Sequence, residues 1–216
     1  MNDWLAPYKH LTLPPLSADG HDDPSDGLCA MEMVAFIERL PHSDRPECTC
    51  PVLAAYVRRL NDLMPSDERQ RLKPLLPRLV GTLSIEHEIA RAEYLAMQAV
   101  NVFAPIALRA SGLGAHASAC ANAVTLAEGR EAAAAAYAAA DAAAYAAAYA
   151  AAHAAAHAAA DAAYAAAYAA ADAAAADADS AWNEALAALE GAISIGPSSG
   201  WTSDIASQVS ALAELA

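Results

Sequence analysis

Two histidines and an aspartate stand four residues apart in an alanine-rich stretch, at His153, His157 and Asp161. Residues four apart lie on neighbouring turns of one helix face, so the two histidines can hold one transition-metal ion between them. Two ligands from a single helix make a weak site unless another segment adds more. The neighbouring side chains are alanines, which cannot orient the ligands by hydrogen bonding. The spacing therefore predicts at most a weak, open metal site.

The pattern around these residues has a second interpretation, an expanded helical repeat. Between residues 137 and 161 a Tyr, Asp or His recurs at every fourth position among alanines. Each four-residue step turns a helix by about 400°, so the marked positions advance by about 40° per step and wind around the helix. Tyr, His and Asp codons can differ in the first base alone, so drift in a repeat encoding Ala-Ala-Ala-X produces the same mixture. A helical spacer explains both the spacing and the residue types.

The loop HSDRPECTCP contains a second candidate metal site. Cys48 and Cys50 can offer two thiolates and His42 a ring nitrogen, a donor set suited to a small structural zinc site. The C-x-C spacing is tight and no C-x-x-C pair accompanies it, so ordinary reduced cysteines also explain the loop. A redox role would need a basic neighbour such as Arg45 to stabilise a thiolate. Zinc is therefore the one cofactor that the sequence suggests, as an alternative to no cofactor at all.

Three consecutive residues, Glu86, His87 and Glu88, are a candidate for acid–base work. Together with Glu93 and His116 they supply carboxylates and imidazoles that can move protons or bind a metal. Acidic residues are also expected at the start of a helix, because they interact favourably with its dipole. The order E-H-E matches no catalytic motif, so the sequence predicts no catalytic residue.

Charge is distributed unevenly along the 216 residues. The net charge is −14, and the segment from Glu131 to the C-terminus holds ten acidic residues and no Lys or Arg. Nucleic-acid binding depends on a basic surface, so this composition argues against it. The basic residues that cluster in sequence are Arg58, Arg59, Arg69, Arg71, Lys73 and Arg78. A solvated helix face explains this cluster, and the alternatives are that it binds the protein's own acidic tail, a partner or nucleic acid.

Cysteine usage and the N-terminus indicate the cellular compartment. Four cysteines are too few and too irregularly spaced for a disulfide framework in a chain of this length. The N-terminus lacks the cationic and apolar segments of a signal peptide. Alanine contributes little to membrane insertion, and two histidines interrupt the stretch 142–160. The sequence therefore predicts a cytoplasmic protein that does not enter a membrane.

Apolar residues at helical spacing predict several helices in the first part of the chain. One runs from Cys29 to Leu40, and the next begins with Pro51 at its first position. Ser66 is expected to cap a third helix. A longer helix is expected from Ser84, with a kink or break near Pro105.

The second part of the chain is expected to contain a weak helix, a rod and a short terminal helix. The weak helix covers about 115–128. Between Arg130 and Gly191 there is neither Gly nor Pro. Alanine is the best helix former, so this stretch is predicted to form one helix of about 90 Å that ends at Gly191. Ser203 is expected to cap the terminal helix.

One segment resembles known sequences. Its features are a C-x-M-E helix start, an HSDRP loop, the run PVLAA, and N-D followed by a basic, proline-containing helix. Over residues 26–82 these features resemble uncharacterised proteins of actinobacteria. The resemblance implies a GC-rich bacterial origin and no established activity, so it identifies no site residue.

The predicted fold class is all-α. The predicted parts are an irregular or disordered arm (1–25), a helical module (26–130), an alanine-rich helix (131–190), and a linker with a short helix (191–216). We predict a non-enzymatic interaction or scaffold protein, in which the module binds a protein partner and the rod is a spacer or drives self-association. The alternatives are a small zinc-binding helical module and, more remotely, a small helical enzyme.

Overall fold

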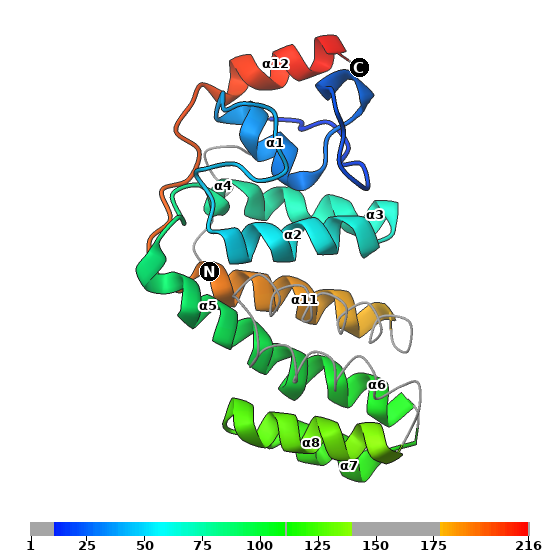
Figure 1. The fold of residues 1–216 in the computed structure, drawn as a ribbon. Helices are drawn as coiled ribbons and strands as arrows, with labels where there is room; N and C mark the ends of the chain where they lie inside the picture. Colours follow the sequence, from blue (N-terminus) through cyan, green and yellow to red (C-terminus); the bar gives the residue numbers. More distant parts are fainter. Residues whose placement is uncertain (1–10, 111, 140–177, 216) are drawn as a thin grey trace. The chain divides into compact units, whose positions relative to one another are not determined.

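A computed structural model describes residues 11–110, 112–139 and 178–215 (Figure 1). Within these ranges the chain forms helices, turns and loops and contains no strand, which confirms the predicted all-α class. No helix in these ranges is long and apolar enough to cross a membrane.

The chain divides into two compact units. The first unit combines Met1–Ile85 with Gly196–Ala216, and the second is Glu86–Ile195. This division differs from the single module predicted over 26–130. The C-terminal residues belong with the first unit because they bond to it. Ser199 N donates to Val80 O at 2.9 Å, and Thr202 N donates to Glu38 Oε1 at 2.9 Å.

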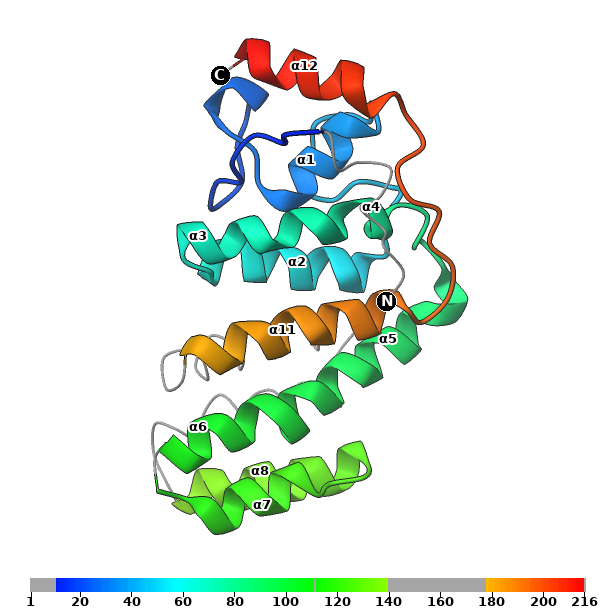
Figure 2. The same ribbon diagram turned by 180° about the vertical axis from the view of Figure 1, so that it is seen from behind.

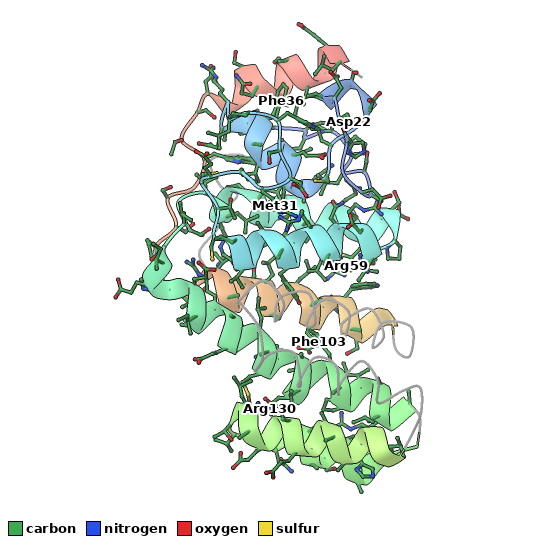
Figure 3. All side chains as sticks on the ribbon, in the orientation of Figure 1. Asp22, Met31, Phe36, Arg59, Phe103 and Arg130 are labelled. Carbon is green, nitrogen blue, oxygen red and sulfur yellow. The ribbon has the colours of Figure 1, made fainter. Side chains whose placement is uncertain are left out.

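Helix α1 (Ala30–Ile37) is the centre of the first unit. It is apolar on all sides apart from Glu32, and nearly all of its residues are buried, as expected of a helix enclosed by its neighbours. It contacts α2 (Pro51–Leu63), α4 (Leu76–Leu79) and α12 (Ile205–Leu215), and both views place it between α12 and the layer of α2 and α4 (Figures 1 and 2). Its Met31 lies among side chains of this unit (Figure 3).

The chain after α2 is a series of short helical pieces. Helix α3 (Ser66–Arg69) begins at Ser66, and its N-cap is Pro65, which makes no side-chain hydrogen bond. The prediction that Ser66 caps this helix is therefore wrong by one position. A 3₁₀ segment, η3 (Gln70–Leu75), follows and contains Pro74. Proline cannot donate a backbone hydrogen bond, and here the chain continues through a 3₁₀ segment into α4 instead of a long α-helix.

The described part of the N-terminal arm is irregular, apart from the short 3₁₀ segment η2 (Pro24–Asp26), and it is bonded to the first unit. The Gln70 side chain pairs with the backbone of Leu16 in both directions, at 2.9 and 3.1 Å. Asn61 Nδ2 donates to Ser17 O at 2.8 Å. These bonds fix the arm to α2 and η3.

A long helical stretch begins at Ile85, the last residue of the first segment of the first unit, and continues in the second unit. Helix α5 (Ile85–Gln98), a π turn (Ala99–Phe103, η4) and α6 (Ala104–Ala110) form 26 continuous helical residues. Pro105 lacks an N–H, and a proline ring clashes with the carbonyl four residues earlier, here that of Asn101. A π turn before the proline widens the backbone at this point. The helix continues through Pro105 without the break that was one of the two predictions, and the irregularity next to the proline is a π turn.

The weak helix predicted over 115–128 is instead two helices, α7 (Gly114–Ala121) and α8 (Leu126–Ala139). The second begins with a capping box. Glu128 Oε2 accepts from Thr125 N at 3.0 Å, and Glu128 N donates to Thr125 Oγ1 at 3.2 Å. The spacing T-x-x-E in the sequence is a recognised start signal for a helix, and it outweighs the continuous run of helix-forming residues.

Alanine side chains fill part of the core of the second unit. Two alanines of α8 pack with residues of η4, α6 and α7, and the whole cluster is Val100, Ala104, Leu108, Ala117, Cys120, Ala133 and Ala136. In helix α11 (Ala178–Ile193) the buried alanines recur at helical spacing, at Ala181, Ala185, Ala188 and Ala192. Small side chains let helix axes approach closely, so alanine contributes to the core beyond residue 130.

The single helix predicted over 131–190 is not confirmed. Residues 140–177 lie outside the described part of the chain. The described ends of this stretch, α8 and α11, both contact the π turn η4. Helix α11 also continues through Gly191 to Ile193, so the predicted stop at Gly191 is wrong.

Candidate functional site

The carboxylate of Glu32 is buried at the start of α1, with 2% of the residue exposed. Glu32 is the third residue of the helix, and Cys29 is its N-cap. Cys29 N donates to Glu32 Oε2 at 2.8 Å, and Glu32 N approaches Cys29 Sγ at 3.4 Å. Cysteine thus replaces the usual Ser or Thr of a capping box. The C-A-M-E run in the sequence therefore forms a helix start.

His21 is the second member of this cluster. Its Nδ1 lies 2.8 Å from Glu32 Oε2, and its backbone N donates to Glu32 Oε1 at 2.7 Å. An ionised carboxylate only accepts hydrogen bonds, so the network assigns a proton to Nδ1 of the ring. Glu32 consequently fixes both the backbone and the ring orientation of His21.

His42 completes the cluster from the loop after α1. Its Nε2 lies 2.7 Å from the carbonyl oxygen of His21 and 4.0 Å from Glu32 Oε1. A carbonyl only accepts, so His42 Nε2 is the donor. His42 Nε2, which could otherwise bind a metal, is therefore engaged with the backbone of the arm.

The hydrogen bonds keep Glu32 ionised. Burial raises the pKa of this carboxyl, but the N–H groups of Cys29 and His21 and the His21 ring lower it by more in total, and the net pKa is below its ordinary value. A carboxylate with a lowered pKa and every oxygen already bonded is a poor general base. Glu32 is therefore suited to a structural role.

An open pocket borders the cluster. Its lining consists of Gly20, His21, Asp22, Glu32, His42, Ser43 and Asp44. Glu32 is hydrogen-bonded within the cluster, and Asp44 Oδ2 lies 3.3 Å from Arg58 Nε. His42 Nδ1 is buried and has no hydrogen-bond partner.

Gly27 closes the other side of His21. Its φ of 126° and ψ of 178° define a conformation that essentially only glycine adopts. A Cβ at this position would lie 2.6 Å from Ser17 Oγ and 2.9 Å from His21 Nε2. The second ring nitrogen of His21 therefore lies against the Gly27 backbone. His21, Glu32 and His42, here called the Glu32 cluster, fasten the arm to α1.

The cysteines predicted for zinc lie beside α2. Cys50 is buried and is the N-cap of α2, and its backbone N donates to Thr82 Oγ1 at 3.0 Å. Cys48 is half-buried, and burial raises the pKa of its thiol. Among the described residues no group of three or more His, Cys, Asp or Glu side chains is arranged to hold a metal ion. Zinc at Cys48, Cys50 and His42 stays a prediction.

Two further groups of candidates were predicted. His153, His157 and Asp161 lie outside the described residues. Glu86 and Glu88 flank His87 in the first turn of α5, where consecutive side chains point about 100° apart and cannot converge on one substrate.

Much of the basic cluster is used inside the first unit. Arg69 is buried and donates to the carbonyls of Asn61 and Met64. Arg71 pairs with Glu68, and Arg58 pairs with Asp44. The interpretation of a solvated helix face is therefore wrong for Arg69, and these arginines offer little unengaged charge to a nucleic acid.

The start of α5 presents large apolar side chains to solvent. Ile85 is 89% exposed and Ile89 is 68% exposed. They stand four residues apart, so they lie on one face of the helix. Glu86, Ala90 and Glu93 are exposed beside them. These five residues are here called the α5 face. The side chains of its two isoleucines are mostly exposed to solvent.

No protein-family model, curated protein or solved structure matches this chain. Function must then be inferred from its own side chains. In the Glu32 cluster the carboxylate is fully hydrogen-bonded and the buried His42 Nδ1 lacks a partner, whereas the α5 face is open.

Sequence reasoning missed both regions for identifiable reasons. The Cys29-x-x-Glu32 spacing was a usable signal, because it is a capping box with cysteine in place of serine. Nothing in the sequence linked His21 to Glu32 across an irregular arm. The spacing of Ile85 and Ile89 predicts a helix face and does not show whether that face is covered.

Proposed function

We propose that the chain is a non-enzymatic interaction protein that docks a partner on the α5 face. The observation that carries this proposal is the exposure of Ile85 and Ile89, at 89% and 68%, on one face of a single helix. Scattered exposed apolar residues are ordinary, whereas large contiguous apolar patches rimmed by polar residues mark interaction surfaces. Ile85 and Ile89 are one turn apart and form the centre of such a patch.

The energetic gain from covering this face is substantial. Burying one isoleucine side chain contributes about 1.5–3 kcal/mol. Further along α5, Arg91, Ala92, Leu95 and Ala96 are buried, and Ala92 and Ala96 continue the stripe that begins with Ile85 and Ile89. The helix is therefore packed over its second half, while the two isoleucines of its first turns stay exposed.

The titratable groups support a binding role over a catalytic one. Burial is the largest influence on the Cys29 thiol and raises its pKa to about 12, which disfavours a nucleophilic thiolate. Glu32 is held ionised by its internal donors, and Glu86, His87 and Glu88 diverge. We place the protein in the cytoplasm on its cysteine usage, and the proposal does not require the alanine-rich segment to be a rigid spacer.

Site-specific photo-crosslinking in the cells that produce the protein tests the proposal. A benzophenone amino acid at position 85 should give a discrete adduct with a partner, whereas the same group at Val124 should not. Val124 is a matched control because it is also highly exposed, at 81%. The adduct should be lost when Ile89 is changed to Ser. Equal adducts from positions 85 and 124, or none from position 85, would contradict a docking role for the α5 face.

A further inference from the structure

Resting on that proposed function, we infer that the α5 face receives a basic amphipathic helix of another protein. Such a partner presents aliphatic side chains flanked by Lys or Arg. The inference concerns the chemistry of the partner, and it follows from the charges and the shape around Ile85 and Ile89.

Acidic residues border the isoleucine pair on both sides. With about 100° of rotation per residue, Glu86 and Glu93 lie along one side of the pair and Glu88 along the other. Glu86 and Glu93 are exposed and Glu88 is half-buried. The only Lys or Arg of α5 is Arg91, which is 0% exposed and so places no charge at this surface. The face is apolar in the middle and negative at its edges, so its complement is apolar and positive.

The shape of the face favours a helix as the partner element. Side chains four apart on a helix form a short ridge, and such ridges pack into the grooves of another helix. An added strand would need the edge of a sheet, and the described residues contain none. An amphipathic helix with Lys or Arg beside its apolar stripe fits both the ridge and the charge.

A second copy of this chain is a poorer match. Pairing two α5 faces would bring Glu86 and Glu93 of one copy close to the same residues of the other, which is unfavourable because like charges repel. The chain as a whole carries a net charge of −14, which adds to this repulsion.

A labelled synthetic peptide with Leu and Lys at amphipathic helical spacing serves as the probe, titrated against the full chain by fluorescence anisotropy. The variant Ile85→Ser/Ile89→Ser should weaken binding at least about tenfold. Glu86→Gln/Glu93→Gln should weaken it several-fold and flatten its dependence on salt. Val124→Ser and Glu184→Gln change an equally exposed apolar residue and an exposed acid elsewhere, and each should leave affinity within about twofold.

Two control peptides separate specific docking from general attraction to an acidic protein. A peptide with Glu in place of Lys should not bind, and one of the same composition with a scrambled order should bind weakly and equally to all variants. The inference is overturned if both α5 double variants bind the Lys peptide as the wild type does, or if the Glu peptide binds equally well. Circular dichroism of each variant should match the wild type, since all changed residues are exposed.

The inference and the proposed function fail in different ways. A position-85 cross-link with no binding of the Lys peptide would overturn the basic-helix partner and leave docking in place. Absence of both would overturn docking itself. A dimer in light scattering that Ile85→Ser/Ile89→Ser dissociates would identify a second copy as the occupant and overturn the inference.

Discussion

The Glu32 cluster and the α5 face differ in how their side chains are used. The cluster holds a carboxylate and two imidazoles, the groups that most enzymes use, but each is bonded to the arm or to α1. The α5 face holds two isoleucines with no reactive atoms, and they are largely uncovered. The side chains with reactive groups are therefore hydrogen-bonded within the Glu32 cluster, whereas the exposed isoleucines of the α5 face carry no reactive group.

Among changes to the Glu32 cluster and the α5 face, Glu32→Gln is expected to have the largest effect on stability. The amide cannot accept from all of the donors that the carboxylate satisfies, and its NH₂ would face other donors. We expect a loss of about 3 kcal/mol of unfolding free energy, measured by urea denaturation with the fluorescence of Trp201, which is buried in the same unit. Glu47→Gln, at an exposed position, is the control and should change it by less than about 0.5 kcal/mol. Equal effects of the two variants would show that the cluster is not a structural tie.

Gly27→Ala should destabilise the protein by about 2 kcal/mol, because it combines a glycine-only backbone conformation with a clash against Ser17 and His21. Gly112→Ala separates these two causes. Gly112 also has a positive φ, 77°, but a Cβ there meets nothing within 4 Å. Its cost should be about 1 kcal/mol in thermal unfolding. If Gly112→Ala lowers stability as much as Gly27→Ala does, the clash with His21 contributes nothing to the destabilisation by Gly27→Ala.

Acid should weaken the cluster in a defined pH range. The pKa of Glu32 is lowered in the folded protein from its ordinary 4.5, so its contribution to stability is complete above about pH 4.5 and is lost as the pH falls through the folded value. The difference in unfolding free energy between wild type and Glu32→Gln should therefore shrink below that pH. Exposed acids titrate equally in both proteins and cancel. A difference that stays constant down to pH 3 would contradict this account of Glu32.

The smallest expected stability effect is at the α5 face. Ile85→Ser/Ile89→Ser should change the unfolding free energy by less than about 0.5 kcal/mol, because these side chains bury little. Leu95→Ala, in the packed second half of the same helix, should cost about 2–5 kcal/mol, measured in the same denaturation experiment. A large effect of the Ile85 and Ile89 changes would mean that the face is already packed.

Local signals in the sequence predicted much of the helical content. Pro51 at the first position of α2 and the apolar spacing of α1 each identify a helix, because capping and periodicity are local properties. The break between α7 and α8 was also encoded, in Thr125 and Glu128, but high alanine propensity obscured it.

Long-range features could not be predicted in this way. The bond between His21 and Glu32 joins an irregular arm to a helix, and the return of the C-terminal residues to Val80 and Glu38 spans most of the chain. Periodicity carries no information about such pairings. It also cannot distinguish an exposed isoleucine pair from a buried one, so the α5 face became evident only from exposure.

Hydroxyl-radical footprinting tests the central claim most directly, by comparing the oxidation of Ile85 and Ile89 in the cells that produce the protein with that in the purified chain. A docked partner should protect both isoleucines in cells, while Val124 is oxidised to the same extent in both settings. Equal oxidation of Ile85 and Ile89 in cells and in the purified protein would contradict the account, because it would show that the α5 face stays uncovered where the protein acts.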